Sequence, residues 1–587
     1  MNRREIYIST HMLNLALWLS ILCANNPVVS QTSFSNQNAE NVLNGNYNPA
    51  SYTPGHIIQS KDSIIDGIIS EIEEDSLKAY LVALEKFGTR NSGSDTISSN
   101  RGIGAARRWI HKKFVEFSAQ NDYRLEVGYL TFFKGICSQV EHRNVMAVLP
   151  GLDTSKKEIV LVEAHMDSRC ESSCDTACYA PGMDDNGSGT VLVMELARVM
   201  SKYSFDRTIV FTTVTAEEQG LQGGSVWAKY FFDQNIDVLA CLNNDIVGGV
   251  ECGLNSSPPS CSPVGAIDSL NLRVFSYSPQ NDSNLVSQGK QLARYVKLQQ
   301  IEEINTRIQV PVNLNLQIRE DRQGRGGDHI PFRQYGFSSI RFTSAHEHGD
   351  GSGQSGDRQH SVNDMLGLDL SVPPDGKLDT FFIDFSYLKR NVLTNAINIS
   401  LLAKSPRTPQ PIYELNAFGN LENLVFQGPD AAFDHRVGIR RINSPSLYFD
   451  TVLTFSKNLI HVSELTPGGN VQLHCMNVAK QIESIPVVHH SDRFLRVSNQ
   501  ASPINCLNLY PNPASNLINV RWKCALAPGD LFFRFYDIQG REVLTGTMKE
   551  EALVGREINI ESLDHGLYEV VFSHQNGDTF HHKLIVQ

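Results

Sequence analysis

The sequence predicts an α/β fold, with a mixed, largely parallel sheet flanked by helices, followed by two small β-sandwich domains. Two short, β-branched apolar runs at residues 158–164 and 208–214 are typical of buried parallel strands. Apolar residues recur at helical spacing after Ser188, which is a suitable helix N-cap. Beyond residue 411 the apolar runs become short and alternating, as in antiparallel sandwiches.

Polar residues follow the ends of the predicted strands. In chain order they are His165, Asp167, Asp185, Glu217, Glu218 and Asp245. Asp185 belongs to an Asp-Asn-Gly turn just before the predicted helix, and Asp245 closes an apolar run that begins at Val238. Open α/β sheets bind ligands beyond the carboxyl ends of their strands. We therefore expect these side chains to share one cleft.

Carboxylates gathered in one cleft repel one another unless a cation neutralises them, so the pattern indicates a metal site. The expected ligands are His165, Asp185, Glu218, Asp245 and His360. Two zinc ions fit this set, because three carboxylates and a bridging hydroxide balance their charge. Nitrogen and oxygen ligands with an open position are typical of catalytic zinc.

Taken together, these motifs resemble the co-catalytic two-zinc aminopeptidases of metallopeptidase family twenty-eight, over about residues 76–402. The resemblance implies one zinc on His165 and Asp245, and a second on Glu218 and His360, with Asp185 bridging both. It also implies that Asp167 bonds the second nitrogen of His165 and that Glu217 is the general base. The implied fold is that of a zinc aminopeptidase.

The last ligand is the least sharply defined. His346 and His348 lie shortly before His360 and compete with it. We choose His360 because it precedes Ser361 and, three residues later, an acid, as the closing ligand of the family does. Several relatives have a tyrosine before this histidine that assists the intermediate, whereas this chain has Gln359. The oxyanion partner beyond zinc is therefore undefined.

The N-terminus predicts export. Residues 1–30 have two early arginines, an apolar stretch at residues 12–24 and small residues before the expected cleavage point, as in a secretory signal peptide. That stretch is shorter than a membrane span, and no later segment approaches the necessary length. The Asn- and Ser-rich residues 31–60 are interpreted as a leader or propeptide.

Cysteine usage agrees with an oxidising compartment. Of eleven cysteines one leaves with the signal peptide, and the even remainder suits disulfides. Cys252 and Cys261 bracket a Pro- and Ser-rich loop and are candidates to pair. Cys170, Cys174 and Cys178 fit either a soft-metal site or disulfides that hold the loop after His165, and we favour disulfides.

Three units follow the predicted catalytic domain at residues 61–404. A Pro-rich linker occupies residues 405–411, and residues 412–490 resemble a fibronectin type III module through residues 465–471 and 483–486. Residues 505–587 resemble the C-terminal sorting domain of type IX secretion substrates, because a Tyr-Pro-Asn-Pro opening, an Asp537–Gly540 hairpin and a closing Lys-Leu-Ile-Val occur in order. This resemblance implies the type IX machinery as a partner and a secreted or outer-membrane-attached protein.

The predicted function is an exported zinc metallopeptidase that hydrolyses peptide bonds with metal-activated water, and an aminopeptidase is favoured. A net charge of -12 argues against nucleic acid as a partner. A carboxypeptidase or dipeptidase on the same zinc core, a glutaminyl cyclase-like acyltransferase and a noncatalytic binding protein stay open as alternatives. Glutaminyl cyclases bind one zinc and lack the intact Asp-Asn-Gly-Ser-Gly turn, which residues 185–189 retain.

Overall fold

The structure is a computed structural model. It describes residues 32–255, 261–279, 285–351, 356–415, 421–442, 444–465, 471–490, 507–522, 530–537, 541–548, 554–574 and 579–586. The predicted signal peptide lies outside the described residues. So do residues 466–470 of the fibronectin-like motif and residues 538–540 of the predicted hairpin turn.

A nine-stranded mixed sheet forms the centre of the large N-terminal unit, with the order β1-β2-β3-β5-β4-β6-β9-β7-β8. Its strands are β1 (Ser33–Phe34), β2 (Glu126–Ile136), β3 (Gln139–Leu149), β4 (Ile159–His165), β5 (Ile209–Val214), β6 (Val238–Asn244), β7 (Asn271–Ser276), β8 (Asn313–Leu316) and β9 (Ser339–Ser344). The four central neighbours β5, β4, β6 and β9 run parallel. Every residue of β4 and β5 is buried, which explains why each strand begins with a continuous apolar run.

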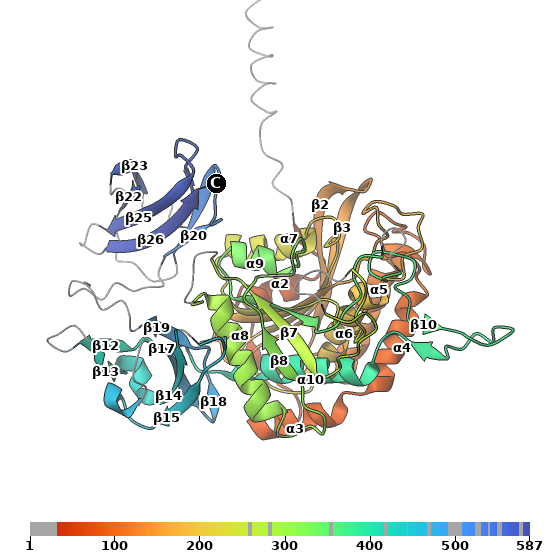
Figure 1. Ribbon diagram of the computed structural model, residues 1–587, viewed down its shortest axis with the longest axis horizontal. Helices are drawn as coiled ribbons and strands as arrows, with labels where there is room; N and C mark the ends of the chain where they lie inside the picture. The colour runs from red at the N-terminus through yellow and green to blue at the C-terminus, as the bar shows by residue number, and fades with distance from the viewer. Residues whose placement is uncertain are drawn as a thin grey trace, which may run out of the picture.

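Helices cover both faces of this sheet (Figure 1). One face packs against α3 (Lys61–Glu71), α4 (Glu74–Glu85), α5 (Gly102–Gln120), α6 (Gly189–Met200), α8 (Gln288–Gln299) and α10 (Phe385–Lys404). The other packs against α2 (Gln37–Leu43), α7 (Gln222–Asp233) and α9 (His329–Gln334). Successive residues of β4 pack into the apolar cores on opposite faces of the sheet. Val160 and Val162 belong to the core on the first face, and Leu161 belongs to the core on the second. The predicted α/β class is confirmed.

The segment interpreted as a leader or propeptide packs on this unit. Strand β1 pairs antiparallel with β2, and Phe34 lies edge-on against Trp227 and Tyr230 of α7. Arg124 donates from Nε to the carbonyl of Tyr52 over 2.8 Å. Residues 32–60 therefore extend the central sheet and cover part of its α7 face.

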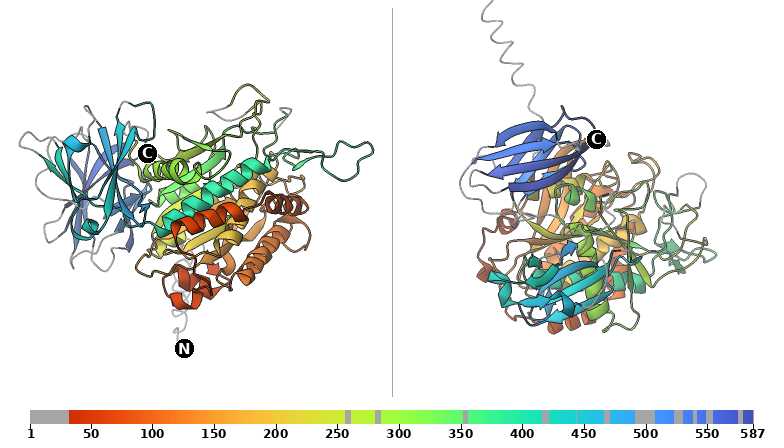
Figure 2. Two further views of the ribbon diagram at one scale, coloured as in Figure 1. Left: turned by 90° about the horizontal axis from the view of Figure 1, so that it is seen from below. Right: turned by 60° about the vertical axis from the view of Figure 1, so that its left-hand side comes forward.

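Two small β domains follow α10, as the sequence predicts (Figure 2). The first has one sheet of β12 (Ile412–Leu415), β13 (Leu421–Val425) and β16 (Leu459–His461). Its second sheet contains β14 (Asp434–Arg441), β15 (Thr451–Phe455), β17 (Val471–Ala479), β18 (Ile482–Glu483) and β19 (Val487–His490). The two sheets enclose a separate apolar core. Its resemblance to fibronectin type III stays a prediction.

The C-terminal domain is a second pair of antiparallel sheets with its own core. One contains β20 (Leu507–Tyr510), β21 (Leu517–Trp522) and β24 (Val554–Asn559), and the other β22 (Leu531–Tyr536), β23 (Glu542–Met548), β25 (Gly566–His574) and β26 (Thr579–Val586). Tyr510 contacts the large N-terminal unit edge-on at Phe232.

Disulfides pair Cys137 with Cys174, Cys170 with Cys178, and Cys252 with Cys261. The prediction that the loop after His165 holds disulfides is confirmed, and so is the Cys252–Cys261 pair. Among the described residues, no helix is long and apolar enough to cross a membrane.

Candidate metal centre

The predicted ligands meet at the carboxyl ends of the central parallel strands. His165 is the last residue of β4, and Asp245 follows β6, its hydrogen-bonded neighbour. Glu218 lies in the turn after β5, on the other side of β4, and Asp185 lies in the turn that leads into α6. His360 reaches the same place from the loop after β9. Parallel strand order therefore gathers residues that are far apart in the sequence.

Two groups of potential ligand atoms share Asp185. His165, Asp185 and Asp245 form one group, and Asp185, Glu218 and His360 form the other. His165 Nε2 lies 3.3 Å from Asp185 Oδ1 and 3.6 Å from Asp245 Oδ1. His360 Nε2 lies 3.2 Å from Asp185 Oδ2 and 3.4 Å from Glu218 Oε2. Each oxygen of Asp185 thus faces a different imidazole.

The chemistry of these residues fits a zinc site. Among the described residues, Asp245 Oδ1 and Glu218 Oε1 are buried without a hydrogen-bond partner, and Asp245 Oδ1 lies 3.6 Å from His165 Nε2 in the cluster. The five side chains are at most 6% exposed. Carboxylate oxygens and imidazole nitrogens are ordinary zinc ligands, and each group contributes three of them.

The electrostatics of the cluster favour positive charge at its centre. Burial alone lowers the pKa of His165, but Glu217, Asp185 and Asp245 raise it well above its usual value. Burial acts against His360 in the same way, yet Glu218, Asp185 and Asp350 raise its pKa to about 10. A cation between the carboxylates would experience the same attraction.

Glu217 lines the same cavity as the ligands, beside Glu218. Burial raises the pKa of Glu217 well above its usual value; His165 opposes this shift, and Glu218 and Asp245 add to it. Its carboxylate is therefore held among the ligands in a dry environment, where it readily takes up a proton.

Asp167 contacts His165 differently from the family-based expectation. His165 Nδ1 lies 3.1 Å from the main-chain carbonyl of Asp167 and 3.7 Å from its carboxylate. The carboxylate instead accepts from the amides of Glu217 and Glu218, at 3.4 and 3.3 Å. Asp167 therefore orients the imidazole through its backbone and holds the Glu217–Glu218 turn through its side chain.

The turn that carries Asp185 is held from two sides. Asp364 accepts from the amides of Asp184 and Asp185, both at 2.9 Å. Ser188 occupies the N-cap position of α6 as expected, but its side chain does not cap the helix. Ser188 Oγ donates to the carbonyl of Asp184, and Asn186 Oδ1 accepts from the amide of Gly189.

Left-handed backbone occurs at or beside three of these positions. His360 itself has φ 56°, Ala216 before the glutamates has φ 59°, and Ile246 after Asp245 has φ 59°. Such a conformation costs a non-glycine residue about 1–3 kcal/mol and persists where the surrounding structure imposes it. Packing and hydrogen bonds therefore force these turns into one shape.

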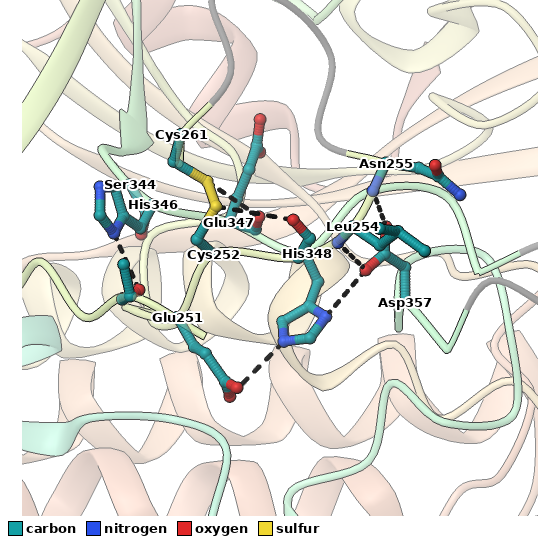
Figure 3. The surroundings of a disulfide bond; sticks show 12 residues. Glu251, Cys252, Leu254, Asn255, Cys261, Ser344, His346, Glu347, His348 and Asp357 are labelled. Atoms are coloured by element: carbon teal, nitrogen blue, oxygen red, sulfur yellow. Dashed lines mark hydrogen bonds and ion pairs between the residues drawn. A yellow bond between two sulfur atoms is a disulfide. The ribbon is translucent and has the colours of Figure 1, made fainter. Parts of the chain in front are cut away.

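His346 and His348 belong to neither ligand group, and Figure 3 shows the contacts that they make instead. His346 Nδ1 lies 2.9 Å from the carbonyl of Ala266. His348 lies between Glu251, at 3.5 Å, and Asp357, at 3.3 Å, beside the Cys252–Cys261 disulfide. Of the three histidines considered, His360 alone joins a group of potential ligands.

Sequence reasoning missed the arginines around the site. Arg169 donates from Nε to Glu218 Oε2 over 2.7 Å, and its Nη2 lies 2.8 Å from His360 Nδ1. Arg341 on β9 is fully buried and lies 2.9 Å from Asp245 Oδ2. An arginine in a polar segment is usually solvated, so only the fold reveals these contacts. The one available signal was the position of Arg169 in the sequence, two residues after Asp167.

Comparison with known proteins identifies the chain. Residues 144–366 match the model of peptidase family M28. A probable zinc metalloprotease of Pyricularia oryzae is 30% identical over 395 residues, an alignment that covers 65% of this chain and 74% of that protein. The chain belongs to peptidase family M28. A second relative, a probable zinc metalloprotease of Leptosphaeria maculans, is 28% identical over 375 residues, covering 61% of this chain and 80% of the relative.

This M28 protein is a zinc metallopeptidase, and its residues 508–587 match a secretion system C-terminal sorting domain. Among solved structures, the LapA aminopeptidase of Legionella pneumophila aligns with a TM-score of 0.41 and 19% identity, covering 60% of this chain and 78% of that chain.

Proposed function

We propose that this M28 protein is an exported aminopeptidase with two zinc ions. The observation that supports it best is the pair of ligand groups joined by Asp185, with Glu217 in the same cavity. In this proposal His165 and Asp245 hold one ion, and Glu218 and His360 hold the other. Bound zinc supplies Lewis acidity, which polarises the scissile carbonyl and makes water acidic enough to act near neutral pH.

The proton chemistry belongs to Glu217. Its carboxylate takes the proton of the attacking water and then delivers it to the leaving amine. Asp167 fixes this turn by accepting from the Glu217 and Glu218 amides, so the base keeps a constant position relative to the ligands. Gln359 donates from Nε2 to the carbonyl of His348, and it is not among the residues that line the cavity.

The cavity beside the ligand groups is small. It measures about 290 Å³, a volume close to that of a single ligand-sized group. The carboxylate of Glu217 is available at its wall to bind the α-ammonium of a peptide. An N-acetyl group would remove that charge and add bulk where the ammonium binds.

The C-terminal domain is the basis for the export proposal. We assign residues 505–587 to sorting by the type IX machinery, and residues 61–404 to catalysis, with the mature enzyme secreted or attached at the outer membrane. The intervening residues 412–490 form a separate β domain.

The decisive experiment compares leucyl peptides that have free and acetylated N-termini. We expect release of the N-terminal residue from the free peptides only. Rapid release of residues from the C-terminus of acetylated peptides would replace the aminopeptidase with a carboxypeptidase on the same metal centre. Cleavage of neither, by protein that contains zinc, would reject the peptidase specificity proposed here.

A further inference from the structure

The cavity that the proposed ligands line also has arginines in its wall. Arg169, Arg322 and Arg325 all face it, although the other charged groups in its wall are carboxylates and His360. Arg322 and Arg325 come from one loop, between β8 and α9, in which Gly324 and Gly326 also line the cavity. Glycine has no side chain, so the backbone of this loop can lie close to the cavity. The arginine side chains therefore reach the cavity over a short distance.

These guanidinium groups are held in place. The side chain of Arg322 is 5% exposed and donates from Nη1 to Glu347 Oε2 over 2.7 Å. Glu347 also lies 2.9 Å from Arg273, so this buried carboxylate contacts two cations. Arg325 is 17% exposed, with Nη1 3.3 Å from His360 Nδ1 and Nη2 3.6 Å from Asp350. The wall is thus built around fixed positive charge.

When the carboxylates of the cavity bind metal ions, positive charge remains on the arginines of its wall. Arg169 is paired with Glu218, a proposed zinc ligand. Once that carboxylate serves a metal ion it neutralises less of the guanidinium charge, and the cavity becomes more positive than its residue composition indicates. A substrate group that complements such a wall is an anion.

Resting on the proposed peptidase function, we infer that the enzyme selects substrates with a carboxylate within one residue of the scissile bond. The arginines at the cavity bind this carboxylate, because guanidinium and carboxylate pair through directed, charge-assisted hydrogen bonds. Arg325 is the specificity residue, since it is the most exposed arginine of the loop that faces the cavity. The carboxylate is either an acidic N-terminal side chain or the α-carboxylate of a dipeptide.

Two pairs of substrates test this inference. Glutamylglycinamide and glutaminylglycinamide differ only in the side-chain carboxylate, and leucylglycine and leucylglycinamide differ only in the α-carboxylate. We expect kcat/KM for the acid of at least one pair to exceed that for its amide by about 10- to 100-fold, the value of one charged hydrogen bond. The pair that shows the preference identifies the source of the carboxylate.

Variants then identify the residue that causes the preference for the acid over its amide. Arg325→Gln should reduce the ratio of kcat/KM for the acid to that for its amide about tenfold or more, mainly by raising KM for the acid. Arg319→Gln is the matched control, because Arg319 belongs to the same loop but is exposed and does not line the cavity. Equal kcat/KM within both pairs overturns the inference, and so does a preference that survives Arg325→Gln.

Failure of the proposed function gives a different result. If zinc-loaded wild-type protein cleaves none of the four compounds, the same compounds are titrated into it calorimetrically. Tighter binding of an acid than of its amide, weakened by Arg325→Gln and not by Arg319→Gln, retains the carboxylate site without the peptidase. Equal binding of acid and amide rejects the site.

Discussion

Arg341 Nη2 lies 2.9 Å from Asp245 Oδ2, and both side chains are buried. The same guanidinium donates from Nη1 to Asp321 Oδ2 over 2.9 Å and from Nε to Thr343 Oγ1 over 3.0 Å. Arg341 therefore joins a proposed zinc ligand to a second buried acid. The neighbouring cations lower the pKa of Asp321, and its position in turn fixes the guanidinium that faces Asp245.

The first prediction concerns this contact. Arg341→Met removes a buried cation and leaves Asp321 and Asp245 without its charge, which should lower the free energy of unfolding by about 3–5 kcal/mol. Chemical denaturation of metal-free protein measures the change. Arg319→Met, at an exposed position, should be close to neutral. A loss below about 1 kcal/mol for Arg341→Met would mean that the pair contributes no more than a surface ion pair.

The second prediction is the pH dependence of the same network. Burial raises the pKa of Asp321, but Arg341, Arg322 and His329 outweigh this effect and lower it to about 2, from an ordinary value of 3.8. A depressed folded-state pKa contributes stability above the unfolded pKa, and this contribution is lost as the pH falls through the folded pKa. The shift corresponds to about 2 kcal/mol.

The Asp321→Asn variant tests this pH dependence of stability. The variant should be less stable than wild type at pH 6, and the difference should close as the pH falls from about 4 to 2. Denaturation midpoints of metal-free protein across this range provide the measurement. A difference that stays constant down to pH 2 would show that Asp321 acts through shape and not through its charge.

The third prediction concerns the general base. Glu217→Gln preserves volume and removes the carboxylate that accepts the proton of water, so kcat should fall about 100- to 10,000-fold. Zinc content should not change, because Glu217 belongs to neither ligand group. Elemental analysis and turnover of a leucyl peptide are measured on the same sample. Activity within a few-fold of wild type would reassign the base.

The sequence predicted the centre of this protein better than its surroundings. His165, Asp185, Glu218 and Asp245 were predictable because each follows a strand or opens a helix, and neighbouring parallel strands end at one edge. The addition of Ser33–Phe34 to the sheet was not, since two residues have no measurable periodicity.

Contacts between distant side chains were also beyond the sequence. Arg341 meets Asp321 and Asp245 only because β9 lies beside β6. The Nδ1 atom of His165 contacts the main-chain carbonyl of Asp167. A main-chain partner of this kind cannot be predicted from residue types, because every residue has a carbonyl group. Residue types near a strand end thus predict ligands, whereas the groups that position them depend on the completed fold.

The fourth prediction separates the three candidate histidines. His360→Ala should reduce zinc from about two ions per chain to about one, because Nε2 of His360 faces Asp185 and Glu218. His346→Ala and His348→Ala should keep both ions, since these rings contact Ala266 and the Glu251–Asp357 pair instead. Loss of zinc from either of these two variants, with His360→Ala fully loaded, would reverse the assignment.

The fifth prediction tests whether Asp185 bridges the two groups. Its oxygens lie 3.3 Å from His165 Nε2 and 3.2 Å from His360 Nε2, so Asp185→Asn weakens both groups at once and should lower zinc content below one ion per chain. Asp245→Asn and Glu218→Gln each affect one group and should retain about one ion.

Asp184→Asn is the control for the Asp185 variant. Asp184 adjoins Asp185 but accepts from the amides of Gly248 and Gly249 through Oδ1, a role that an asparagine oxygen can keep. The Asp184→Asn variant should therefore retain both zinc ions and most of the stability of the wild-type protein. Elemental analysis after dialysis against a fixed low zinc concentration compares the four variants. If Asp185→Asn retains as much zinc as Asp245→Asn, the two groups bind independently, and the shared carboxylate does not bridge them.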